Sequence, residues 1–158
     1  MTIQHIADNL NQLSERHEQL IESGLKKKQA IISKDLDTLM RIMRNESKLI
    51  KEISLLDDER ASLSRKLMIE KGVKHRFNMS FKQLMSIVFN VDDRLLMQGV
   101  HRRLEEALIE LRRINEINQA LLNQSLDFIQ FSIELFISPE DESYTYKRPT
   151  DYPSQPRA

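Results

Sequence analysis

The sequence contains no cysteine and no tryptophan, only three glycines, and no proline before Pro139. The absence of cysteine excludes a disulfide framework and cysteine-based metal sites. Scarce glycine and the lack of internal proline favour long, uninterrupted helices. With 158 residues, of which 40% are apolar, the chain is predicted to be an all-α protein of ordinary domain size.

The chain also lacks an excess of either charge, with 24 basic and 24 acidic residues. A general binder of nucleic acid or of acidic membranes would carry a basic surplus, so neither class fits. No apolar run reaches the roughly 18 residues of a membrane-spanning helix, and the amphipathic start, MTIQHIADNLNQL, does not resemble a signal peptide. We therefore expect a cytoplasmic protein with no membrane insertion and no nucleic-acid partner.

Two heptad-spaced apolar stripes predict an antiparallel helical hairpin, with helices over about 2–32 and 34–70. The first stripe has weak positions at His17, Gly24 and Lys27, and the second includes a charged residue, Glu46. Ser33 is a candidate cap for the second helix. A break near residue 33 is favoured over one continuous helix, which stays the alternative. Met43 and Ile50 widen the second stripe to the face of a bundle helix.

A short helix and one very long C-terminal helix are expected after the hairpin. Ser80 and Gln83 match a capping box that starts a helix over about 80–89. The last helix is predicted over about 92–137 and would be about 70 Å long. Residues 138–158 hold all four prolines and all three tyrosines and are expected to be disordered. The prediction is a three-helix coiled-coil bundle over 1–137, followed by a disordered tail.

The histidines and glycines of this chain do not have the spacing found in common metal and phosphate sites. No histidine pair has the spacing of a helical metal site, and no glycine-rich phosphate loop exists. A histidine phosphotransfer role is disfavoured for His17, which lies on an apolar stripe, and for His101, which has no phospho-relay motif around it. We expect no catalytic residue, no metal and no cofactor.

The segment INEINQALLNQSLDFIQF (114–131) places Asn115 and Asn118 on the predicted inner seam, between Leu108 and Leu122. Buried asparagines cost free energy unless they are hydrogen-bonded. They could fix the register of the bundle, lie at the solvent boundary, or face a groove that takes another chain's helix, and the periodicity leaves these alternatives open.

From residue 121 to 137 the helix is apolar almost all round, which a two-layer bundle cannot fully cover. The surplus face predicts a partner-binding surface, unless the rest of the bundle wraps it. The residues expected to contact a partner are Asn115, Asn118, Leu122, Leu126, Phe128, Ile129 and Phe131.

The segments at residues 17–53, 111–136 and 138–146 together resemble the FlgN family of flagellar type III export chaperones. HEQLIESGLKKKQAIISKDLDTLMRIMRNESKLIKEI (17–53) is similar to its helical hairpin with a central Glu46. LRRINEINQALLNQSLDFIQFSIELF (111–136) is similar to its segment with two asparagines and a Leu- and Phe-rich run. SPEDESYTY (138–146) resembles the tail that follows.

The resemblance implies a cytoplasmic chaperone with no catalytic activity. Its clients would be the hook–filament junction proteins FlgK and FlgL, whose amphipathic terminal helices it would bind before assembly. Docking to the export gate protein FlhA would use Tyr144 or Tyr146 of this chain. The alternative is a self-associating coiled-coil scaffold without client binding, and a weak homo-oligomer stays open in either case.

Overall fold

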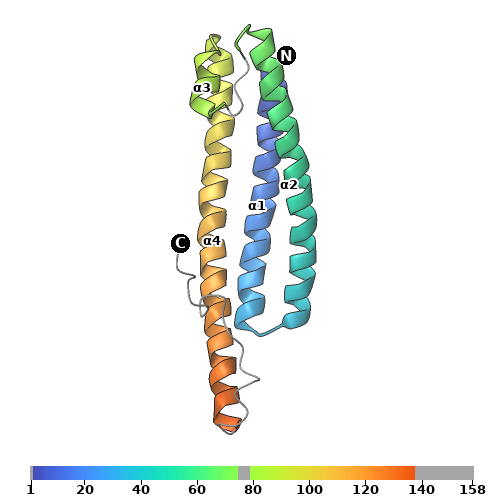
Figure 1. Cartoon of the computed structure of the whole chain (residues 1–158), viewed down its shortest axis with the longest axis vertical. Coiled ribbons are helices and arrows are strands. Elements are labelled where there is room, and N and C mark those ends of the chain that lie inside the picture. Colours follow the sequence, from blue (N-terminus) through green and yellow to red (C-terminus); the bar gives the residue numbers. More distant parts are fainter. Residues whose placement is uncertain (1, 75–78, 138–158) are drawn as a thin grey trace, which may run out of the picture. The chain divides into compact units, whose positions relative to one another are not determined.

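The computed structural model describes residues 2–74 and 79–137. Their regular secondary structure is entirely helical (Figure 1), with four helices: α1 Thr2–Ile32, α2 Leu36–Glu70, α3 Phe81–Ser86 and α4 Val91–Phe136. The all-α prediction, with one very long C-terminal helix, is confirmed for these residues. The tail expected over 138–158 lies outside the described residues.

Helix α3 is shorter than the expected span of 80–89. Ser80 caps it through the predicted capping box with Gln83, but the helix ends at Ser86. The reason lies in the next cap: the side chain of Asn90 accepts a hydrogen bond from the Asp93 amide, at 3.1 Å, and so starts α4. The residues between the two helices must leave the helical conformation to reach this cap.

The chain turns back after Ile32, and α1 and α2 form an antiparallel hairpin (Figure 1). Lys34 adopts a left-handed conformation with φ of 57°. Asp35, and not Ser33, caps α2 by accepting hydrogen bonds from the Thr38 amide and hydroxyl, at 3.1 and 2.6 Å. Ser33 instead donates its hydroxyl to the carbonyl oxygen of Gln29.

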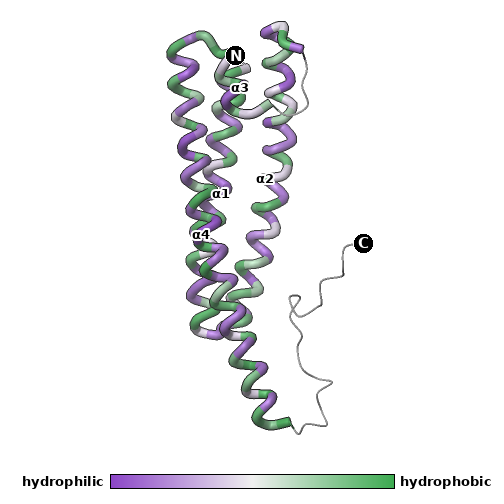
Figure 2. Tube along the Cα trace, turned by 60° about the vertical axis from the view of Figure 1, so that its left-hand side comes forward, coloured by the Kyte–Doolittle hydropathy of each residue, from purple (hydrophilic) through white to green (hydrophobic). Residues whose placement is uncertain are grey.

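Polar contacts set the antiparallel register of this hairpin along its whole length. The pairs run in opposite directions along the two helices: Thr2 with Glu70, Asn9 with Glu59, Arg16 with Glu52 and Lys27 with Glu46. Between them lie the apolar stripes, which Figure 2 shows as alternating hydrophobic and hydrophilic residues along the helices.

The charged residues on the two apolar stripes, Lys27 and Glu46, form an ion pair between α1 and α2. Lys27 Nζ lies 2.6 Å from Glu46 Oε2, and the two side chains are only 17% and 14% exposed. A partly buried ion pair tolerates its loss of water only when both charges are present. Each charge would be unfavourable on an apolar stripe by itself, but together the two residues form one contact between the helices.

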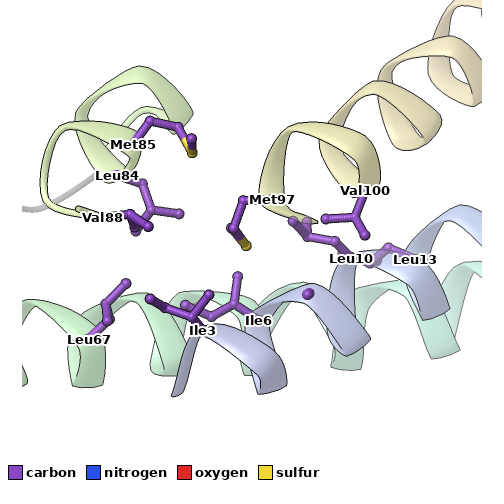
Figure 3. Packing of buried hydrophobic residues seen from close by; sticks show 11 residues of the cluster. Ile3, Ile6, Leu10, Leu13, Leu67, Leu84, Met85, Val88, Met97 and Val100 are labelled. Carbon is purple, nitrogen blue, oxygen red and sulfur yellow. The ribbon is translucent and has the colours of Figure 1, made fainter. Parts of the chain in front are cut away.

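The main core lies at the end of the hairpin that holds the N-terminus. Figure 3 shows Ile3, Ile6, Leu10 and Leu13 of α1 facing Met97 and Val100 of α4 and the apolar side chains of the α3 region. Met97 is completely buried. Arg94 fastens α3 to α4, because its guanidinium donates to the carbonyl oxygens of Met85 and Val88, at 2.8 and 3.0 Å.

The chain divides into two compact units, Met1–Asn118 and Gln119–Ala158, and α4 runs through the boundary. The buried residues of α4 all lie in the first unit: Met97, Val100, Ala107, Ile114 and Asn118.

Within the first unit, α4 lies parallel to α1 and contacts it at successive levels. Arg103 forms a bidentate pair with Glu18, at 2.9 and 2.8 Å. The hydrogen bonds from Arg103 lower the pKa of the Glu18 carboxyl below its usual value. Further along, Ile114 packs onto Gly24 so closely that a Cβ atom on Gly24 would lie 2.6 Å from Ile114 Cγ2.

The inner seam of α4 is displaced from its expected position. Ala107 and Ile114 are buried, whereas Leu108 and Asn115 are exposed. The prediction of the seam was wrong at these levels, because the side chain that Gly24 lacks leaves room for Ile114, and this places Ile114 on the inner face of α4.

Replacing Gly24 with alanine should destabilise the protein, although alanine is the better helix former. Overpacking against the stiff Ile114 side chain costs about 1–3 kcal/mol, which exceeds the gain in helix propensity of about 0.5–1 kcal/mol. Gly99→Ala is the matched control, since a Cβ there would meet no described atom within 4 Å, and it should stabilise. Urea denaturation monitored by circular dichroism measures both free energies of unfolding. Equal stabilisation by both substitutions would show that α4 shifts freely at Gly24.

Candidate functional site

Asn118 holds α4 against α1. Its side chain is 3% exposed, and Nδ2 donates a hydrogen bond of 2.9 Å to the carbonyl oxygen of Gly24. Its Oδ1 is buried and has no hydrogen-bond partner among the described residues. An acceptor left unpaired in this way costs free energy. Asn118 therefore contributes less to stability than to the position of α4 on α1, which its hydrogen bond to Gly24 fixes. For Asn118, this geometry agrees with the alternative in which the asparagine fixes the register of the bundle.

Asn115 lies in a different environment and is exposed to solvent. Because the buried line of α4 passes through Ile114 and Asn118, Asn115 lies at its edge. The two asparagines therefore do not act as a pair on one face. Asn118 belongs to the first unit's interior, and Asn115 to its surface.

The strongest candidate for a binding surface is the C-terminal part of α4, which we call the apolar segment (residues 121–137). Of its predicted contact residues, Leu122 and Leu126 are half-buried. Phe128, Ile129 and Phe131 are more exposed, at 60%, 53% and 58%. Single exposed apolar side chains are common, but a continuous run of them marks an interaction site.

Two further residues of the apolar segment were missing from the predicted set. Leu135 and Phe136 are exposed by 65% and 88%. Leu135 follows Phe128 and Phe131 at helical spacing, so the same periodicity could have found it. A shallow hollow of about 400 Å³ lies among Phe128, Ile129, Ser132, Ile133, Phe136 and Ile137.

Two polar side chains of the apolar segment donate hydrogen bonds within their own helix. Ser132 donates its hydroxyl to the carbonyl oxygen of Phe128 at 2.8 Å, and Gln130 donates to Glu134 at 3.1 Å. These contacts leave the aromatic and aliphatic side chains as the main feature that a partner would meet. Such a surface binds by burial of apolar area, which is non-directional.

A second hollow lies inside the first unit, where α1, α2 and α4 surround about 420 Å³ near α3. Its two histidines already have contacts: His17 Nδ1 donates to the carbonyl oxygen of Leu13 at 2.7 Å, and the His101 ring stacks on Phe81 with centroids 3.7 Å apart. Both rings are thus built into the walls, which supports the structural explanation of these histidines.

The described part of the chain offers no metal site, since no group of three or more His, Cys, Asp or Glu residues there could hold an ion. None of the helices in residues 2–74 and 79–137 is long and apolar enough to cross a membrane. The tyrosines expected to dock to the export gate, Tyr144 and Tyr146, lie outside the described residues.

Asn118→Ala should destabilise the protein relative to Asn115→Ala. Both substitutions gain the same helix propensity, so their difference isolates the contact with Gly24. We expect Asn118→Ala to be less stable than Asn115→Ala by about 1–2 kcal/mol, from the lost hydrogen bond and side-chain packing. Urea denaturation of the two variants provides the measurement. Equal stabilities would mean that the Asn118 contact does not hold α4 in solution.

No solved structure matches the chain. The chain is similar to the uncharacterized protein YvyG of Bacillus subtilis (strain 168), with 22% identity over 148 residues, which cover 94% of this chain and 88% of that protein. The model of the FlgN protein family matches residues 1–154. The match spans nearly the whole sequence, and the chain therefore belongs to the FlgN family, a family of flagellar export chaperones and not of enzymes.

Proposed function

We propose that this protein is a cytoplasmic chaperone that binds the amphipathic terminal helices of hook–filament junction proteins of the FlgK and FlgL type. The observation that carries the proposal is the exposure of Phe128, Ile129, Phe131, Leu135 and Phe136 along one helix. Covering the two central phenylalanines alone would contribute about 1.5–3 kcal/mol each when fully buried. An amphipathic helix is a suitable partner, because its own apolar stripe needs the same cover.

The chaperone activity follows from this mutual burial. An unassembled terminal helix exposes an apolar stripe that would otherwise self-associate or aggregate. Seated on the apolar segment, the stripe is removed from water and premature assembly is prevented. No covalent step is needed, so the proposal assigns no catalytic residue and no cofactor.

The predicted contact residues take different parts in this proposal. Leu122, Leu126, Phe128, Ile129 and Phe131 contact the client directly. Asn115 provides a polar group at the edge, and Asn118 acts indirectly by holding α4 on α1. Tyr144 and Tyr146 dock to the export gate protein FlhA, to which the client is delivered.

A second candidate function, a self-associating scaffold, has one observation in its favour. Helix α2 exposes an apolar stripe made of Leu36, Met40, Met43 and Ile50. Met43 and Ile50 were expected to widen the packed face of this helix, but both are exposed in the described structure. Light scattering over a range of concentrations separates the two functions, because a scaffold would remain a stable oligomer on dilution.

Phe131→Glu should weaken the binding of a client's terminal helix at least tenfold. A carboxylate at the centre of an apolar contact loses water without a partner, and about 1.4 kcal/mol suffices for a factor of ten. The matched control is Ile109→Glu, since Ile109 is an exposed apolar residue (65%) on the same helix in the first unit. Titration calorimetry with a FlgK-type helix measures both affinities, and circular dichroism checks helicity. Undiminished binding by the Phe131 variant, or equal loss in both, would contradict the assigned surface.

A further inference from the structure

We infer that the first unit has a helix-binding site of its own, in which one amphipathic helix of another protein lies between α2 and α4. The partner helix carries basic residues beside its apolar stripe at the end near α3 and acidic residues at its other end. No residue of the apolar segment takes part in this site, so the inference goes beyond the proposed function.

Helix α3 shows what kind of element fits this side of the first unit. Leu84, Met85 and Val88 belong to one buried cluster with residues of α1, α2 and α4 (Figure 3). The α3 region thus takes the place of the fourth helix of a four-helix bundle, but α3 is only six residues long. Beside it lies the second hollow, of about 420 Å³, which α3 borders through Phe81 and Leu84.

Two apolar stripes extend this hollow along α2 and α4. Asp57 of α2 lines the hollow, and Ile50 and Met43 lie one and two heptads from it on the same side of the helix. Both are more than half exposed, at 57% and 52%. On α4, Leu104 and Leu108 line the hollow, and Leu108 is 45% exposed. The α2 stripe is about 21 Å long at 1.5 Å per residue, which suits about four turns of a partner helix.

Charged residues flank the two stripes in a segregated pattern. Asp58 and Glu105 each directly follow a residue that lines the hollow. Lys51 and Arg112 lie one heptad from them, and both steps lead away from α3, because α2 and α4 run in opposite directions (Figure 1). All four side chains are exposed. The level near α3 therefore carries two carboxylates, and the level one heptad further carries two cations.

Other charges near the stripes leave this pattern in place. Glu52 forms an ion pair with α1, and Glu110 forms one within α4. Further from α3, Arg44 and Glu116 have opposite signs, so the pattern is confined to the two levels.

Charge complementarity then defines the partner. In paired helices the residues that flank the apolar seam face those of the partner and set partner choice. Cations of the partner suit the level of Asp58 and Glu105, and carboxylates suit the level of Lys51 and Arg112. A single helix enters the space between α2 and α4 more readily than a second copy of this chain, whose long helices already pack in a bundle of their own.

Two designed helical peptides with the same apolar stripe and the same composition test the inference. In the segregated peptide, lysines flank the stripe at one end and glutamates at the other, whereas the mixed peptide alternates them. Each peptide is titrated into the full chain. We expect the segregated peptide to bind about five- to tenfold more tightly at low salt, as a few exposed ion pairs allow. The preference should shrink in 1 M salt, where the Debye length falls to about 3 Å.

Charge-reversed variants locate the preference on the chain. Lys51→Glu with Arg112→Glu should remove it, because both levels then carry carboxylates. The matched control is Lys66→Glu with Arg102→Glu, which makes the same change in net charge at exposed positions of the same two helices. Each control residue lies two positions from a residue that lines the hollow, which places it on the opposite side of its helix. The control should keep the preference.

A variant of the apolar stripe locates the peptide itself. Leu108→Glu should weaken the binding of the segregated peptide at least tenfold, because the carboxylate loses water without a partner. Ile109→Glu is the matched control, since Ile109 is 65% exposed and does not line the hollow. Circular dichroism checks that both variants keep their helicity.

The outcomes separate this inference from the proposed function. Phe131→Glu should leave the preference for the segregated peptide intact, and its loss there would place the peptide on the apolar segment instead. Undiminished binding by the Leu108 variant would overturn the site. Equal binding of the two peptides, or a preference that survives in the Lys51 and Arg112 variant, would overturn the charge pattern of the partner. A dimer of the chain that Leu108→Glu abolishes would assign the site to a second copy.

Discussion

The close approach of α4 to α1 at Gly24 is the contact on which the first unit depends. A side chain at this position would collide with Ile114, so the absence of one sets how near α4 can come. That proximity also brings the Gly24 carbonyl within 2.9 Å of Asn118. One glycine thus permits a packing contact and a polar contact on successive turns of α4, and the buried residues of α4 end at the second of them.

The polar part of this contact favours specificity over stability. A leucine at position 118 would avoid the unpaired Oδ1, but it would also pack against many apolar surfaces equally well. An amide that needs one particular carbonyl distinguishes the correct register of α4 from a register shifted by a turn. Lys27 and Glu46 serve the same purpose within the hairpin, since each buried charge requires the other.

The heptad stripes predicted the helices α1 and α2, because each helix has a heptad-spaced apolar face, and a break near residue 33 was favoured over one continuous helix. They were insufficient for α4, where adjacent lines of apolar residues, such as Leu108 and Leu111 beside Ile114 and Ile117, give the pattern no single phase. Ala107 and Ile114 therefore form the seam in place of Leu108 and Asn115. The partner of Asn118 is a backbone carbonyl, which no side-chain pattern can reveal. The exposure of Phe128 and Phe131, in contrast, agrees with the surplus of apolar residues that the periodicity indicates.

Helix α4 consequently differs in burial along its length. Its buried residues up to Asn118 stabilise the first unit, whereas the part beyond that point exposes Phe128, Phe131 and Phe136. A surface of exposed phenylalanines carries a risk of self-association, and a sequence that only maximised apolar area would increase it.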